Sequence, residues 1–130
     1  MKKNVSIFFL LVMIIGLVFN IGCKKTGEGI DITDGTWAFF LETIDGSSAL
    51  VYDFQGNPQQ GNVYFQNENR GTFTVSGNMV NFTVNHYDGD NNLYVYTYSG
   101  LLSDYFNMSG SFYINMPDGS TINGTFTAER

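Results

Sequence analysis

The feature that most constrains the fold is an alternation of apolar and polar residues that begins at Trp37 and continues almost to the C-terminus. It forms eight runs of period two, the spacing of half-buried strands, over residues 37–42, 50–54, 63–65, 72–75, 80–85, 93–98, 105–114 and 121–128. Turn signals rich in Gly, Asn, Asp and Ser separate them, at residues 45–47, 56–58, 67–69, 76–78, 88–90, 99–100 and 118–120. No segment after residue 30 has helical apolar spacing. We therefore expect an all-β domain.

The short connections predict how these strands are ordered. Strands joined by tight turns pair with their sequence neighbours, so we expect an eight-stranded antiparallel up-and-down meander. Such a meander has two exposed edges unless its first and last strands pair, and closure into a small barrel removes both. A β-sandwich is the alternative, but sandwiches usually need longer Greek-key crossings than this chain offers.

Composition narrows the classes of partner. Residues 23–130 hold one Trp, eight Tyr and nine Phe, and these residue types favour strands. The same segment has four cationic and 12 acidic residues, a formal charge of −8. We therefore expect no nucleic-acid partner. A single cysteine excludes an intramolecular disulfide, so the core alone must stabilise the domain.

That cysteine, Cys23, follows the three parts of a secretory signal. Lys2 and Lys3 precede a 13-residue apolar run over residues 7–19, and the small Gly22 stands directly before Cys23. The run is short of the roughly 20 residues that span a bilayer. The segment resembles a bacterial lipoprotein signal peptide, which implies a lipid-modified Cys23 as the mature N-terminus and a membrane as its partner. Ordinary secretion or an uncleaved anchor is the alternative.

The expected organisation has three parts. Residues 1–22 are a lipoprotein signal peptide, residues 23–33 the lipidated cysteine and a short tether, and residues 34–130 the barrel. In the lipoprotein family, Asp directly after the cysteine favours inner-membrane retention. This chain has Lys24 there, so the resemblance implies the cell envelope and favours the outer membrane.

Three residues at the two ends of the domain carry a second resemblance. Gly35 and Trp37 open the first run, and Arg130 follows the last. The Gly-x-Trp start is similar to that of the calycins, the lipocalin and avidin group of barrels, and in particular to small bacterial lipocalin-like lipoproteins. The resemblance implies that Arg130 packs over the Trp37 ring and closes one end of the barrel. Otherwise Trp37 is an ordinary core residue and Arg130 a terminal charge.

A barrel of this kind predicts a small apolar or amphipathic ligand in its open mouth. The candidate lining residues are aromatic residues in the predicted strands, namely Phe39, Tyr52, Phe82, Phe106, Phe112 and Phe126. Tyr94, Tyr96 and Tyr98 share one strand face, which lines the cavity if it points inward and forms an exposed patch if it points outward. The alternative is a solid barrel that acts as a surface protein-interaction lipoprotein.

Catalysis is not expected, nor is a cofactor. His86 is the only histidine, and the chain has no Gly-x-Ser-x-Gly motif. Asp88, Asp90 and Asn92 have the spacing that begins a calcium loop, but the sixth and twelfth positions lack the required Gly and Glu. They stay candidate metal ligands, against the simpler interpretation of a polar hairpin tip.

Overall fold

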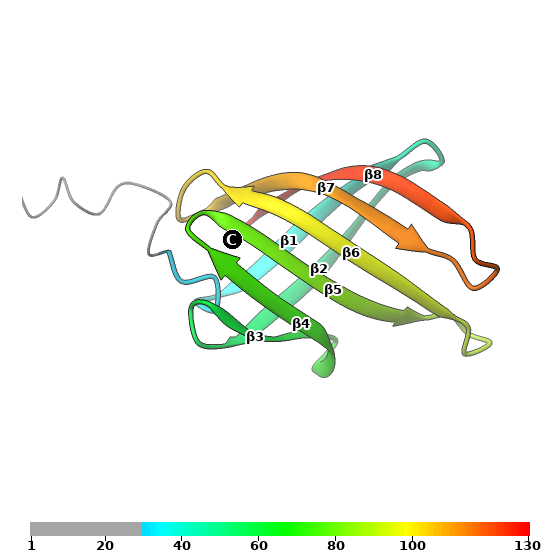
Figure 1. Ribbon diagram of the computed structural model, residues 1–130, viewed down its shortest axis with the longest axis horizontal. Helices are drawn as coiled ribbons and strands as arrows, with labels where there is room; N and C mark the ends of the chain where they lie inside the picture. The colour runs from blue at the N-terminus through cyan, green and yellow to red at the C-terminus, as the bar shows by residue number, and fades with distance from the viewer. Residues whose placement is uncertain (1–29) are drawn as a thin grey trace, which may run out of the picture.

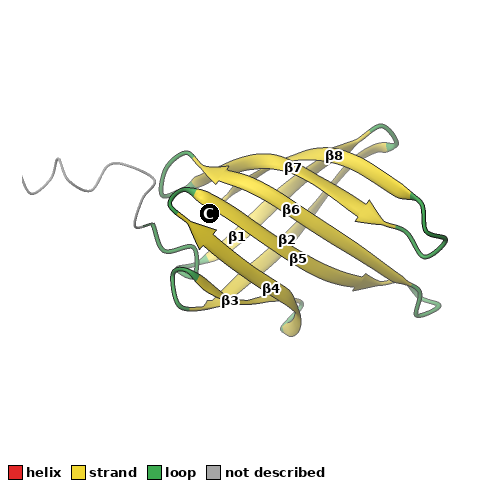
Figure 2. Ribbon diagram, viewed as in Figure 1, coloured by secondary structure: helices red, strands yellow, loops and turns green. Residues whose placement is uncertain are grey.

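The structure, a computed structural model, describes residues 30–130 as eight antiparallel strands in a closed barrel (Figure 1). The strands are β1 (Thr36–Thr43), β2 (Gly46–Gly56), β3 (Gln60–Phe65), β4 (Glu68–Ser76), β5 (Met79–Tyr87), β6 (Leu93–Leu102), β7 (Asn107–Asn115) and β8 (Thr121–Glu129). Strands and loops make up all of this part of the chain (Figure 2). Within residues 30–130 there is no helix long and apolar enough to cross a membrane.

Each strand pairs with the next, and β1 also pairs with β8, where Phe39 lies opposite Ala128. This last pairing closes the sheet and removes both edges. The predicted all-β, eight-stranded meander barrel is confirmed, and the β-sandwich alternative is wrong.

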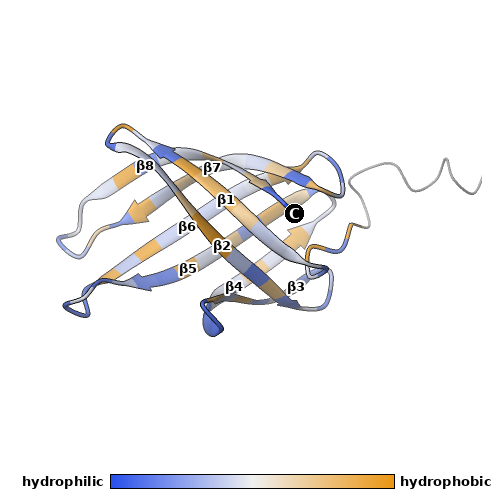
Figure 3. Cartoon of the chain, turned by 180° about the vertical axis from the view of Figure 1, so that it is seen from behind, coloured by the Kyte–Doolittle hydropathy of each residue, from blue (hydrophilic) through white to orange (hydrophobic). Residues whose placement is uncertain are grey.

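The alternating pattern separates the inside of the barrel from the outside. Along β1, Trp37, Phe39 and Leu41 are buried, whereas Phe40 between them and Glu42 after them are exposed. The hydropathy colours change along the strands in the same way (Figure 3). Every strand contributes to one core, whose largest fully buried side chains are Trp37, Tyr52, Tyr98, Phe39, Phe54 and Phe73. No polar or charged residue of the described part is buried in it.

The barrel has two different ends. At the first, which we call the closed end, β1 begins and β8 finishes, beside the β2–β3, β4–β5 and β6–β7 turns and the chain from residue 30 (Figure 1). The opposite end, the open end, carries the β1–β2, β3–β4, β5–β6 and β7–β8 turns.

One predicted turn is wrong. Ser99 and Gly100 lie inside β6, and the turn to β7 comes later, at residues 103–106. Gly100 faces the interior, where a Cβ atom would come within 2.7 Å of the Phe126 ring. This glycine therefore makes room for a core ring, a role that local sequence cannot distinguish from that of a turn former.

Candidate ligand site at the open end of the barrel

Trp37 fills the closed end. Its side chain is fully buried, and its indole Nε1 donates a hydrogen bond to the Ile32 carbonyl at 3.0 Å. The Arg130 guanidinium lies over the indole, 4.6 Å from the ring centroid. Gly35, two residues before Trp37, has φ of +92°, a conformation that suits glycine. Residues 30–33, which were expected in the tether, therefore contact the barrel, since Ile32 is also fully buried.

Arg130 connects the segment before β1, residues 31–34, to the β6–β7 turn. Its Nη1 donates to the carbonyls of Asp31 and Asp34 at 2.7 and 2.6 Å, and its Nε donates to the Tyr105 carbonyl at 2.6 Å. The guanidinium also lies 3.8 Å from the Tyr105 ring centroid, and the Tyr105 hydroxyl donates to the Asp34 carboxylate. These contacts cover Trp37 and fill this end of the barrel.

Aromatic rings fill the middle of the barrel. Phe39 is central, with its ring centroid 5.1 Å from Tyr52, 5.5 Å from Phe82 and 5.4 Å from Phe126. Phe82 stacks on Tyr98 at 4.3 Å. Rings at these separations are in contact. The structure thus places these four predicted lining residues, Phe39, Tyr52, Phe82 and Phe126, in a packed layer beneath the mouth.

A short polar chain crosses this layer. The Tyr52 hydroxyl lies 2.7 Å from the Tyr98 hydroxyl and 2.7 Å from His86 Nε2. Burial raises the pKa of both tyrosines well above the usual value, so both stay protonated. Burial, assisted by the charge of Arg70, lowers the pKa of His86 to about 4, so the imidazole is neutral near pH 7.

The number of available protons determines which group donates in each of these two hydrogen bonds. Tyr98 is 1% exposed, and the described residues offer its hydroxyl no second hydrogen-bond partner. If Tyr98 accepted from Tyr52, its own hydrogen would be buried without an acceptor, at a cost of about 1–3 kcal/mol. Tyr98 therefore donates to Tyr52, and Tyr52 donates to His86 Nε2. The His86 proton must then sit on Nδ1.

A pocket of about 320 Å³ lies above the packed layer, at the open end. Its walls come from strands at opposite ends of the sequence and from the β1–β2 turn. The apolar part of the lining is Leu41, Phe112, Ile114, Met116 and Ile122, and the polar part is Thr43, Asp45, Ser47 and Ser48. Gly46 also lines the pocket, and Tyr94 and Tyr96 add rings that are both apolar and polar. An apolar floor with a few polar groups at its rim is typical of small-molecule sites.

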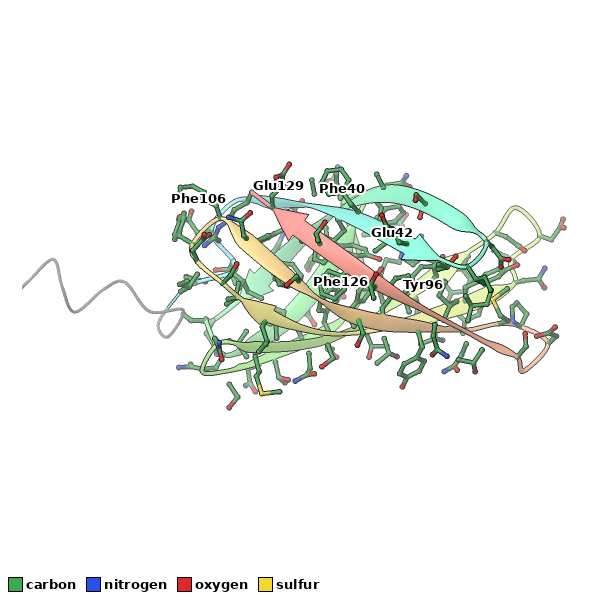
Figure 4. The ribbon with its side chains drawn as sticks, turned by 90° about the horizontal axis from the view of Figure 1, so that it is seen from above. Phe40, Glu42, Tyr96, Phe106, Phe126 and Glu129 are labelled. Atoms are coloured by element: carbon green, nitrogen blue, oxygen red, sulfur yellow. The ribbon has the colours of Figure 1, made fainter. Side chains whose placement is uncertain are left out.

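The three tyrosines of β6, Tyr94, Tyr96 and Tyr98, all point inward but lie at different depths. Tyr98 belongs to the packed layer, whereas Tyr94 and Tyr96 are half-buried and line the pocket. Burial is the main cause that raises the pKa of both pocket tyrosines, so both hydroxyls remain protonated near neutral pH. The Tyr94 hydroxyl lies 3.3 Å from Asp88 Oδ2, to which it donates. Tyr96 is set toward the open end of the barrel, whereas Phe126 lies nearer its middle (Figure 4).

Phe106 does not line the interior, contrary to the prediction. It is 57% exposed and precedes β7 at the closed end, far along the barrel from Tyr96 (Figure 4). The inward phase of β7 is as expected, because Met108, Phe112 and Ile114 are buried. The strand simply begins after residue 106, so the alternation continues past the end of the wall. Of the predicted lining residues, the pocket brings together Tyr94, Tyr96 and Phe112.

Sequence reasoning missed most of the other lining residues. Leu41, Ile114 and Ile122 are the apolar inward residues closest to the open ends of their strands. In a meander, the direction of each strand determines which of its ends faces the mouth, so these positions could have been sorted by their distance from a turn. Ser47 and Ser48 have no comparable signal, because they line the pocket only through the path of the β1–β2 hairpin.

The predicted metal candidates organise a hairpin tip. The Asp88 carboxylate accepts hydrogen bonds from the backbone N–H groups of Asp90 and Asn92, both at 2.9 Å, and from the Asn92 side chain at 3.0 Å. These bonds lower the pKa of Asp88. Among the described residues, no group of three or more His, Cys, Asp and Glu side chains is placed to hold a metal ion.

Comparison with known proteins supports the architecture. A scan against protein-family models gives no match, and neither does a search of curated proteins. Among solved structures, the chain is similar to that of EF1p2_mFAP2b bound to DFHBI, with a TM-score of 0.64 and 16% sequence identity. The match covers 81% of this chain and 98% of the other. At this identity the likeness shows a shared barrel fold. Cys23 and the segment predicted to be a signal peptide lie outside the described residues.

Proposed function

We propose that this protein is a membrane-anchored, extracytoplasmic lipoprotein whose barrel binds a small apolar or amphipathic ligand in its open mouth. The observation that carries the ligand proposal is the pocket of about 320 Å³ above the packed aromatic layer. Its volume is at the small end of the range for ligand sites, about 300–1,000 Å³. The ligand is therefore a small molecule held at the mouth, above a filled barrel.

The lining indicates the chemistry of that ligand. Phe112, Ile114 and Ile122 offer apolar contact, and Tyr96 offers an aromatic face with a neutral hydroxyl. Asp45 at the rim disfavours an anionic ligand, as does the overall acidity of the chain. A neutral ligand with a flat apolar body and one polar edge fits these groups best. The structural neighbour, a barrel solved with bound DFHBI, supports the proposal by analogy of fold.

The anchoring part of the proposal is supported by the sequence alone. Lys2, Lys3, the apolar run and Gly22-Cys23 favour export, followed by lipidation of Cys23. Several acyl chains would hold the protein stably, since each buried methylene contributes about 0.8 kcal/mol. Lys24 favours the outer membrane. We propose no catalytic activity, since the Nε2 of His86, the only histidine, is engaged by Tyr52 inside the barrel.

A second candidate function is a surface protein-interaction lipoprotein. The packed central layer favours it, as do the exposed apolar residues on the outer wall, among them Phe40 at 45% and Val51 at 47%. On this alternative the mouth binds nothing, and the outer face contacts another protein.

A pair of neighbouring substitutions separates the two functions. Ile122 points into the pocket, and Thr121 beside it points outward at the same end of β8. Ile122→Trp places an indole in the mouth, whereas Thr121→Trp places the same group on the outer surface. Binding of the neutral probe N-phenyl-1-naphthylamine is followed by its fluorescence.

We expect the wild-type protein and Thr121→Trp to bind the probe equally well. Ile122→Trp should weaken binding at least tenfold, because the added ring occupies the site. Equal binding to all three proteins would place the probe elsewhere, and no binding to the wild-type protein would favour the interaction function.

A further inference from the structure

The described chain enters the barrel at the closed end and is fixed there. Ile32 is fully buried, and its carbonyl accepts the hydrogen bond from the Trp37 indole. Arg130 donates to the carbonyls on either side, those of Asp31 and Asp34. The first described residue, Ile30, therefore has a defined place relative to the barrel axis, at the end opposite the mouth (Figure 1).

We propose that the closed end rests against the bilayer and that the mouth points away from it, so that the site loads its ligand from the aqueous phase. This proposal rests on the proposed lipidation of Cys23. It deepens the proposed function by naming the surface that contacts lipid and the side from which the ligand comes.

The length of the tether supports this orientation. Six residues, and therefore seven Cα–Cα steps, separate Cys23 from Ile30. Seven steps reach about 24 Å when the segment is fully extended and about 15 Å on average when it is flexible. The nine residues of β8 run about 30 Å, or about 23 Å along the barrel axis at the usual strand tilt of about 40°. To bring the mouth to the lipid, the tether would have to lie fully stretched along the barrel wall.

The rim of the closed end has side chains that suit a membrane interface. Met79 and Leu101 lie directly opposite each other on β5 and β6 and are 48% and 50% exposed. Tyr105 and Phe106 in the β6–β7 turn are 41% and 57% exposed, and their rings are in edge-to-face contact at 5.0 Å. Aromatic and aliphatic side chains of this kind are favoured at the level of lipid head groups.

Exposure alone does not choose the end, because the open end also exposes Ile44, Tyr87 and Leu93. The position at which the chain enters the barrel therefore identifies the closed end as the end nearer the membrane.

The charge of the closed end indicates which type of lipid it contacts. Asp31, Asp34, Asp104 and Glu129 lie at the closed end, against the single cation Arg130 among the described residues there. Such a surface fits a zwitterionic bilayer better than an anionic one.

The orientation can be measured with the full lipidated chain. Cys23 is the only cysteine, so an introduced thiol is the one free site for a fluorophore once Cys23 is acylated. Gln59→Cys labels the β2–β3 turn at the closed end, and Asp90→Cys labels the β5–β6 turn at the open end; both positions are exposed. The proteins are inserted in phosphatidylcholine vesicles that contain a head-group nitroxide lipid.

We expect the nitroxide to quench the Gln59→Cys label several-fold more strongly than the Asp90→Cys label. Replacing Leu101 and Phe106 together by Ser should reduce that difference at least twofold. The control Tyr113→Ser should leave it unchanged, because Tyr113 is as exposed as Tyr105 but lies on the outer wall near the open end. Exchange of phosphatidylcholine for phosphatidylglycerol should not increase the difference.

Equal quenching of the two labels would overturn the proposal, and so would stronger quenching of the Asp90→Cys label. Mass spectrometry of the mature N-terminus identifies which premise has failed. If Cys23 is acylated and the labels are quenched equally, the orientation alone is wrong. If Cys23 carries no lipid, the proposed anchoring is wrong and the orientation falls with it.

Discussion

Replacing Trp37 with alanine should remove much of the stability of the domain. The side chain is fully buried at the closed end, donates to the Ile32 carbonyl at 3.0 Å and lies under Arg130. Truncation of a buried Trp to Ala costs about 3–5 kcal/mol. The lost cation–π contact lies within a range of about 0.5–2 kcal/mol. Since these costs overlap, we expect a loss of about 4–5 kcal/mol, against a usual domain stability of about 5–15 kcal/mol.

Urea unfolding followed by circular dichroism measures this loss without relying on the Trp37 fluorescence that the change removes. With a slope of about 1.5–2 kcal/mol per molar urea, the midpoint should fall by about 2–3 M. The matched control is Phe40→Ala on the same strand, because Phe40 points outward and is 45% exposed. We expect that control to lose less than about 1 kcal/mol. A comparably small loss for Trp37→Ala would refute the claim that Trp37, packed under Arg130, stabilises the closed end of the barrel.

Two further predictions concern the interior. The free energy of unfolding should fall by about 1–2 kcal/mol as the pH drops from about 6.5 to about 4, because His86 binds a proton in the unfolded chain well before it does in the fold; solvent screening at this half-buried site reduces the effect. His86→Phe should lack this part of the pH dependence. Nitrogen NMR of the His86 imidazole in the wild-type protein should find its proton on Nδ1. A proton on Nε2 would contradict the proposed hydrogen bond from the Tyr52 hydroxyl to Nε2. Gly124→Ala should cost about 1–3 kcal/mol, because the new Cβ would come within 2.7 Å of the Phe112 ring and 2.3 Å of the Glu42 carbonyl oxygen. Gly89→Ala, with open space around it, should change stability by less than about 0.5 kcal/mol, and equal losses at both positions would count against the packing argument.

The fold could be predicted from the sequence because period-two patterning and short turns constrain a meander strongly. The error at Ser99-Gly100 has a physical reason, since glycine serves both a turn and a crowded inward position. Phe106 shows the complementary difficulty. The alternation of side chains begins at residue 105, before the first residue of β7, so the pattern cannot tell where the barrel wall ends.

The site was harder to predict than the fold. The inward positions of Phe39, Tyr52 and Phe82 follow from the alternation, but whether their rings line a cavity or fill it depends on the distances across the barrel. Those distances follow from closure and strand tilt, which local sequence does not encode. Tyr96 and Phe112 line the pocket because their positions on β6 and β7 lie closer to the open end.

The most direct test of the central claim is native mass spectrometry of the protein extracted under mild conditions from the membranes of its own cells. The account predicts that the folded protein retains a small neutral molecule, that Ile122→Trp loses it and that Thr121→Trp keeps it. A wild-type protein that carries only its N-terminal lipid, and takes up no neutral aromatic probe at the mouth, would contradict the proposal of a ligand-binding barrel.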